Sequence, residues 1–298
     1  MRIVTRADFD GVVCAVILFE ALEIKQPVKW VEPSEIQKGQ ANIREGDILA
    51  NLPYNKNCSM WFDHHYSNRI DHSFEGAFEI APSAAGVVYN YYKHRLNQDY
   101  SELIRETDRI DSADLNMGEV MFPEKNPYVL LSMTITGNRK EDEPYWNRII
   151  DLLRKKDIND VIKDPEVKTR CGGVAKENKE YKGHLLKHTT MKKHVAITDF
   201  RSFKKTPVGN RFLVYSLFSE SVVNVKIRYD NDDREKVIVS VGHSIFNRNC
   251  NVNVGKMLSN FEGGGHRGAG ACNFHVNKAD EYILKIIDIL IKNRENSS

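Results

Sequence analysis

The stretch SMWFDHHYSN, residues 59–68, decides how the rest of the sequence is read. A short apolar run, typical of a sheet strand, ends abruptly in Asp63, His64 and His65. The triplet is either a polar loop that happens to contain histidines or part of a metal site at the carboxyl end of a strand. Carboxylate and imidazole groups are common metal ligands, and the spacing alone leaves both interpretations open.

Segments on both sides of this stretch alternate between strand-like and helix-like patterns. Such alternation predicts an α/β fold with a parallel sheet that is covered on both faces. Ligands of these sheets gather outside the carboxyl ends of the strands. We predict strands at 2–5, 28–31, 47–51 and 59–62, and helices at 10–22, 33–39 and 83–96.

The remainder of the chain divides into a charged helical stretch and a β-rich end. Residues 146–193 read as helices that join two domains, although surface helices of the first domain would give the same pattern. We expect an α/β domain at 1–160, a helical linker at 161–190 and a smaller α+β domain at 191–298. Within the last domain the pattern predicts strands at 195–200, 212–218, 222–229, 236–242 and 272–276, and helices at 253–261 and 279–293.

The composition narrows the class of protein. The chain of 298 residues has a formal net charge of only +2, which argues against long duplex DNA as a partner. Its five cysteines are scattered and form no C-x-x-C pair, so neither a disulfide framework nor a cysteine zinc site is predicted. No segment is long and apolar enough to span a membrane. We expect a cytoplasmic protein, whose oligomeric state is open, with a homodimer as one option.

Polar side chains also follow two other predicted strands. Asp8 and Asp10 come after the first strand, where the chain turns at Gly11, and Asn51 ends the third strand. Two carboxylates this close repel each other, and a divalent cation removes the repulsion. A single aspartate that caps the following helix is the simpler alternative. Together with residues 63–65, these side chains predict a metal site along one edge of the sheet.

Three motifs, TRADFDG, FDHH and GGGHRGAGA, start at Thr5, Phe62 and Gly263 in that order. Together they resemble the DHH phosphoesterase superfamily, in the branch that carries a C-terminal DHH-associated domain. Members of this family include nanoRNases, cyclic dinucleotide phosphodiesterases, RecJ-type exonucleases and exopolyphosphatase-related proteins. The resemblance spans almost the whole chain. It implies a catalytic DHH domain with a parallel sheet, followed by a substrate-binding DHH-associated domain.

The resemblance implies a role for each polar residue at the sheet edge. Metal ions, usually Mn²⁺ with Mg²⁺ or Co²⁺ as substitutes, would activate a water that attacks phosphorus. Asp10 and His64 match ligands of one metal position, and Asp8 matches a ligand of the other. His65 would lie near the substrate phosphate, and Asp63 would support the site.

The family has a further acidic ligand after the DHH motif. Residues 105–114 offer Asp108, Asp111 and Asp114, of which we favour Asp108 with Asp111 as its rival. A solvated helix end would explain the same run of charge.

Two positions depart from the family pattern. Arg6 stands where the first motif has histidine, and Asn51 stands where the family has a metal-bridging aspartate. Arginine cannot ligate a cation, and an asparagine oxygen binds one only weakly. Together the two changes equal the charge of one divalent ion, so we expect Arg6 to take the place of that ion and hold a phosphate. An eroded site and two weakly bound metals are the alternatives.

The C-terminal motif predicts a substrate-binding loop. Glycines let backbone N–H groups approach a ligand, and the loop centres on Gly264, Gly265, His266 and Arg267. Glu262 stands where the family usually has another glycine. The upstream polar segment 244–255 leads into a helix whose N-terminus could hold a phosphate or a base, or it only caps that helix. Its candidate substrate-binding residues are Ser244, Arg248, Asn251 and Asn253.

Two classes of function compete. The first is a metal-dependent phosphodiesterase that hydrolyses short oligonucleotides or linear dinucleotides to mononucleotides. An exopolyphosphatase or pyrophosphatase activity is the rival chemistry, and a nucleotide-binding protein with a degraded catalytic site is the non-enzymatic alternative. The near-neutral charge favours short substrates over long polyanions, and the polar segment 244–255 favours a ligand with a base. We therefore predict the phosphodiesterase.

Overall fold

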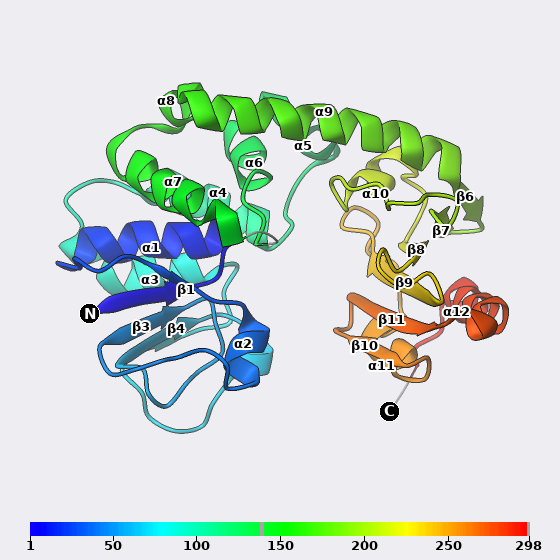
Figure 1. The fold of residues 1–298 in the computed structure, drawn as a ribbon, viewed down its shortest axis with the longest axis horizontal. Helices are drawn as coiled ribbons and strands as arrows, with labels where there is room; N and C mark the ends of the chain where they lie inside the picture. The colour runs from blue at the N-terminus through cyan, green and yellow to red at the C-terminus, as the bar shows by residue number, and fades with distance from the viewer. Residues whose placement is uncertain (138–139, 297–298) are drawn as a thin grey trace. The chain divides into compact units, whose positions relative to one another are not determined.

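The chain forms two compact units, which Figure 1 shows: a first unit of Met1–Leu115 and Pro123–Gly172, and a second unit of Asn116–Phe122 and Gly173–Ser298. The structure is a computed structural model that describes residues 1–137 and 140–296. The second unit thus includes a short segment from the region that the sequence analysis assigns to the first domain. The last boundary falls between two adjacent glycines inside helix α9 (Pro165–His188).

The first unit is built on a five-stranded sheet in which all neighbouring strands are parallel. The strand order is β2-β1-β3-β4-β5, with bounds β1 Arg2–Thr5, β2 Lys29–Trp30, β3 Asp47–Ala50, β4 Met60–Asp63 and β5 Gly76–Phe78. The four predicted strands are present, whereas β5 is too short to predict. Gly76 pairs with Trp61 at a φ of 120°, and a Cβ there would lie 2.0 Å from the Trp61 carbonyl oxygen. Glycine therefore allows β5 to approach β4 this closely.

Helices pack on this sheet and bury its strands. Helix α1 (Phe9–Ala21) is buried from Phe9 to Leu18, which explains why its sequence is largely apolar on all sides apart from Asp10. Val4, Leu49 and Trp61 of three neighbouring strands pack in one cluster with Ile36 of α2 (Pro33–Gln37). The other helices assigned wholly to this unit are α3 Ala84–Tyr92, α4 Ser101–Asp111, α6 Pro127–Ser132, α7 Glu143–Lys155 and α8 Ile158–Lys163.

The second unit contains a six-stranded mixed sheet, in which β7 and β8 are parallel and the other neighbours are antiparallel. Its order is β10-β11-β9-β8-β7-β6, with bounds β6 Thr189–Lys192, β7 Val195–Asp199, β8 Val223–Tyr229, β9 Lys236–His243, β10 Gly263–Gly265 and β11 Ala269–His275. Valine and isoleucine side chains of β7, β8 and β9 form a core with apolar side chains of two helices. The shorter helices of this unit are α5 Met117–Met121, α10 Leu213–Leu217, α11 Val254–Ser259 and α12 Ala279–Lys292.

The strand predicted at 212–218 is wrong, because this segment folds as α10. A short apolar run fits a buried strand and a buried helix equally well, so its pattern does not distinguish them. In the structure the Tyr215 hydroxyl donates a hydrogen bond to the Gly242 carbonyl of β9 at 2.7 Å, which ties α10 to the sheet. The predicted α/β fold class is confirmed. Among the described helices, none has the length and hydropathy needed to cross a membrane.

Candidate metal centre

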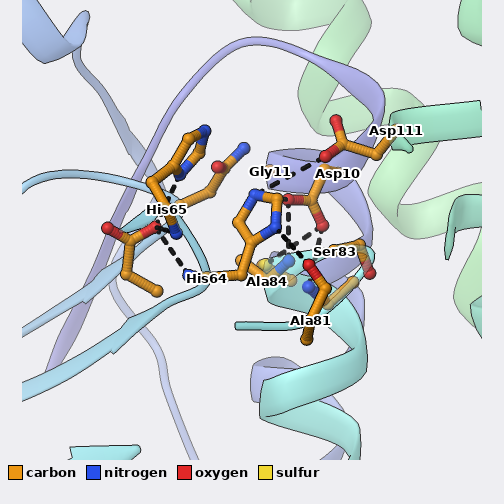
Figure 2. A network of polar contacts seen from close by, with 12 residues as sticks. Asp10, Gly11, His64, His65, Ala81, Ser83, Ala84 and Asp111 are labelled. Atoms are coloured by element: carbon orange, nitrogen blue, oxygen red, sulfur yellow. Dashed lines mark hydrogen bonds and ion pairs between the residues drawn. The ribbon is translucent and has the colours of Figure 1, made fainter. Parts of the chain in front are cut away.

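Three neighbouring strands of the first unit end at the same edge of the sheet. Asp8 and Asp10 follow β1, Asn51 follows β3, and Asp63 is the last residue of β4. Because β1, β3 and β4 are adjacent and parallel, their carboxyl ends bring these side chains together. Figure 2 shows the polar network at this edge.

Asp10, His64 and Asp111 form what we call the cation cluster. One possible ligand atom from each residue lies within 4.8 Å of the others. The Nε2 atom of His64 is 3.8 Å from Oδ2 of Asp10 and 3.5 Å from Oδ2 of Asp111 (Figure 2). The three residues come from α1, from the residue after β4 and from the end of α4. Two carboxylates and one imidazole form a ligand set that suits Mn²⁺ or a similar divalent ion.

Asp10 is buried and fixed by the backbone of α3. Only 2% of the residue is exposed. Its oxygens accept hydrogen bonds from the N–H of Ala84 at 3.0 Å and of Ala85 at 2.7 Å, at the N-terminus of α3. Burial, followed by the charges of Asp111 and Asp8, raises the pKa of Asp10 well above its usual range. A bound cation would oppose both effects.

His64 presents an unpartnered ring nitrogen to the two carboxylates. Its Nδ1 donates to the Ala81 carbonyl oxygen at 2.9 Å, because that oxygen can only accept. Its Nε2 is buried, and no described residue gives it a hydrogen-bond partner. The Nε2 atom therefore faces two carboxylates, an arrangement that is favourable only with a proton or a metal ion between them. On this observation the cluster fits a divalent metal ion.

The acid of helix α4 that joins the cluster is Asp111, which the structure favours over Asp108. The carboxylate of Asp108 instead accepts a hydrogen bond from the Ser83 hydroxyl at 2.6 Å, and Ser83 caps the N-terminus of α3. The two acids are three residues apart and lie on one face of the helix, so the sequence pattern alone does not separate them. The sequence identifies Ser83 as the N-cap of α3 by its position, whereas its hydrogen bond to Asp108 was not predicted.

Asp63 organises the turn that carries the two histidines. Its Oδ1 accepts from the backbone N–H of His64 at 2.9 Å and of His65 at 3.4 Å, and from Nδ1 of His65 at 2.8 Å. Its Oδ2 accepts from the Asn68 side chain at 2.6 Å. These four donors leave Asp63 little capacity to ligate a metal. The hydrogen bond to Asp63 raises the pKa of His65, whose side chain is 42% exposed.

Asp8, another expected metal ligand, lies outside the cation cluster and is engaged by protein donors. Its Oδ1 accepts from the N–H of Gly11 at 2.8 Å and from the Asn51 amide at 3.0 Å. Its Oδ2 lies 3.4 Å from Nη1 of Arg6. Nε of Arg6 also lies 3.5 Å from Glu32, a neighbour that the sequence analysis missed. Arg6, Asp8 and Asn51 therefore form a second polar group, the arginine triad, at the same sheet edge.

The glycine-rich motif forms the β10–β11 hairpin of the second unit. A Cβ at Gly255 would lie 2.2 Å from the Gly265 carbonyl oxygen, so the hairpin packs directly onto α11. Glu262 has a φ of 60°, the left-handed conformation that glycine adopts most easily, which fits the glycine usual at this position of the family. His266 and Arg267 are exposed, and Gly264 beside them is partly buried.

The predicted substrate residues of segment 244–255 make hydrogen bonds within the second unit. The Ser244 hydroxyl accepts from two backbone N–H groups of its own turn, and the Asn253 side chain caps α11. The Asn251 backbone N–H donates to an asparagine side chain near the C-terminus, and Nε of Arg248 donates to a backbone carbonyl. These bonds agree with the alternative in which the segment caps the helix.

Comparison with solved structures gives strong similarity over the whole chain. The pGpG-specific phosphodiesterase PggH from Vibrio cholerae matches with a TM-score of 0.86 and 28% identity, over 98% of this chain and 99% of PggH. RecJ from Thermus thermophilus, in complex with Mn²⁺, matches with a TM-score of 0.58 and 12% identity, over 99% of this chain and 52% of RecJ. Another structure, of an exonuclease RecJ bound to manganese, matches with a TM-score of 0.56 and 11% identity, over 99% of this chain and 91% of that protein. No family model matches the sequence, and a search of curated proteins gives no match.

Proposed function

The chain belongs to the DHH phosphoesterase superfamily, and on that premise we propose that it is a metal-dependent phosphodiesterase that hydrolyses linear dinucleotides to mononucleotides. The similarity to PggH carries this proposal, because it extends over both units at 28% identity. The RecJ structures support the fold alone. The substrate class that we propose is a 5′-phosphorylated dinucleotide, with pGpG as its representative.

We propose that Asp10, His64 and Asp111 hold the metal, with Mn²⁺ as the resident ion and Mg²⁺ or Co²⁺ as substitutes. When bound, such an ion lowers the pKa of a water ligand and withdraws charge from a phosphate oxygen. Two of the proposed ligands are already oriented before a metal binds. The N-terminus of α3 fixes the Asp10 carboxylate, and the Ala81 carbonyl fixes the ring of His64. Fixed ligands lower the reorganisation that the reaction requires.

We propose that His65 binds a phosphate oxygen of the substrate. The hydrogen bond to Asp63 raises the pKa of His65 and favours its imidazolium form. A charged N–H donor binds a phosphate oxygen more strongly than a neutral donor does. Asp63 then acts through His65 and through the turn it organises, which makes it a positioning residue.

For the second unit we propose a role in binding the nucleotide part of the substrate. The support is the exposed β10–β11 turn, where His266 and Arg267 offer polar donors next to the backbone of Gly264 and Gly265. Arg248 is a further candidate. We also propose a reducing, cytoplasmic setting, which agrees with the free thiols of all five cysteines.

The proposed substrate is tested with a hydrolysis panel in the presence of Mn²⁺. The panel contains pGpG, longer RNA, cyclic dinucleotides, polyphosphate and pyrophosphate. We expect pGpG to be cut to mononucleotides faster than any other member. Faster turnover of long RNA, polyphosphate or pyrophosphate would contradict the proposal, and tight binding of pGpG without hydrolysis would favour a nucleotide-binding protein.

Two variants connect this activity with the cation cluster. His64→Ala removes the imidazole and should lower pGpG hydrolysis at least ~100-fold, because a metal ion contributes several kcal/mol to the transition state. Arg44→Ala is the control, because Arg44 precedes β3 at the opposite end of the strand from Asn51 and donates to the exposed Gln26. Its activity should equal that of the wild type. A fully active His64→Ala variant would place the chemistry elsewhere.

A further inference from the structure

We infer that each chain binds a single divalent cation, at the cation cluster, and that Arg6 supplies the neighbouring positive charge and binds a substrate phosphate. The starting observation is that the polar side chains at the sheet edge form two groups that differ in charge. In the cation cluster, two carboxylates face the buried Nε2 of His64, which has no hydrogen-bond partner among the described residues. The arginine triad also contains a buried atom without such a partner, the Asn51 amide oxygen, but its one carboxylate, Asp8, accepts two hydrogen bonds on Oδ1 and has the Arg6 guanidinium 3.4 Å from Oδ2.

The carboxylates at this edge all have a neighbouring positive charge or hydrogen-bond donors once one divalent ion is present. Asp10 and Asp111 carry two negative charges that one such ion matches. Asp63 accepts four hydrogen bonds from neighbouring N–H groups. Asp8 has the guanidinium of Arg6 at 3.4 Å. A second divalent ion would bring two more positive charges close to Arg6 without a free carboxylate to receive them.

Asn51 strengthens this inference, because it holds Asp8 and offers little to a metal. The residue is 2% exposed, and its left-handed backbone, with a φ of 56°, fixes where the side chain starts. Its amide nitrogen donates to Asp8 at 3.0 Å. The amide oxygen has no hydrogen-bond partner among the described residues. A single neutral oxygen binds a divalent ion weakly, since such ions need several oxygen ligands and prefer carboxylates.

Arg6 is held in place but retains donors for a ligand. Asp8 and Glu32 flank it at 3.4 and 3.5 Å, and its side chain is 43% exposed. A guanidinium has five N–H donors in a planar fork, so two ion pairs leave donors for a phosphate. The phosphate contact rests on the proposed function, whereas the number of metal ions does not.

The number of metal ions is measured on purified protein by elemental analysis and by titration with Mn²⁺. We expect about one Mn²⁺ per chain in the wild type, and two well-occupied ions would overturn the inference. Arg6→His should leave the count at one, because Asn51 still supplies no carboxylate. The double variant Arg6→His, Asn51→Asp should bind two. A count of one in a double variant with native circular dichroism would show that these side chains do not exclude the second ion.

The phosphate contact is measured through KM and through binding of pGpG. Arg6→Ala should keep one Mn²⁺ but raise KM for pGpG about 10- to 100-fold, as expected for a lost charge-assisted hydrogen bond. In Arg6→Lys the rise in KM should be smaller, because lysine restores a positive charge. In Arg44→Ala the KM should equal that of the wild type. An unchanged KM and unchanged binding in Arg6→Ala would overturn the contact. A wild type that binds one Mn²⁺ but neither binds nor cuts pGpG would contradict the proposed function and leave the metal count standing.

Discussion

Asp10 combines two tasks in one side chain. It satisfies two N–H groups at the N-terminus of α3, and it also contributes a carboxylate to the cation cluster. Replacing it would leave those buried donors unpaired, at a cost of about 1–3 kcal/mol each. Asp111, at the end of α4, is partly exposed, and among the described residues it makes no such contact with a helix N-terminus. A substitution at Asp111 therefore tests metal binding without leaving buried N–H groups unpaired.

We predict that Asp111→Asn stabilises the metal-free protein while it weakens metal binding. Among the charged groups that raise the pKa of Asp10, the carboxylate of Asp111 has the largest effect. Replacing it with a neutral amide removes the repulsion between the two side chains. The melting temperature without metal should rise by a few degrees, and Mn²⁺ affinity should fall at least about tenfold. Thermal melts with and without Mn²⁺ measure both effects. Asp71→Asn, a change at an exposed carboxylate, should change neither; a lower melting temperature in Asp111→Asn would contradict the prediction.

At the scale of elements, hydrophobic periodicity predicts the parallel sheet but not its short or ambiguous parts. The segments at 2–5, 47–51 and 59–62 are largely apolar, and each is ended or followed by polar residues, so both the strands and the polar residues at their ends can be read from the sequence. β5 depends on a close approach at Gly76, and α10 depends on its packing, neither of which leaves a local pattern. The identity of the α4 acid likewise depends on helix packing, which sequence spacing does not encode.

Alanine substitutions at two glycines test how closely α1 packs against the end of β1. A Cβ at Gly11 would lie 2.0 Å from the Arg6 carbonyl oxygen, whereas one at Gly172 meets no atom within 4 Å. We predict that Gly11→Ala lowers the free energy of unfolding by about 3 kcal/mol or more through overpacking. Gly172→Ala, in the middle of α9, should raise it by about 0.5–1 kcal/mol. Urea denaturation measures both variants, and equal effects would show that α1 can shift away from β1.

At the scale of the whole molecule, metal binding should stabilise one unit in particular. All three tryptophans, Trp30, Trp61 and Trp146, belong to the first unit, which also contains the whole cation cluster. Tryptophan fluorescence therefore reports on the unit that contains the cation cluster, and circular dichroism reports on both units.

We predict that Mn²⁺ at ~100 times its Kd stabilises the first unit by about 2.7 kcal/mol. The fluorescence transition should move to higher temperature, and a chelator should reverse the shift. His64→Ala should show no shift, because the cluster loses its imidazole. A transition that moves in circular dichroism but not in tryptophan fluorescence would place the metal outside the first unit.

Helix α5 has a consequence for how the chain is synthesised. It belongs to the second unit, yet α4 before it and α6 after it belong to the first. Its partner α10 begins roughly 90 residues later. A ribosome needs about 5–20 s to add that length, so α5 leaves the exit tunnel long before α10 exists. If the gene were divided at the last boundary, the two helices would never meet in one chain. A fragment ending at Gly172 would carry α5 without α10, and a fragment starting at Gly173 would carry α10 without α5.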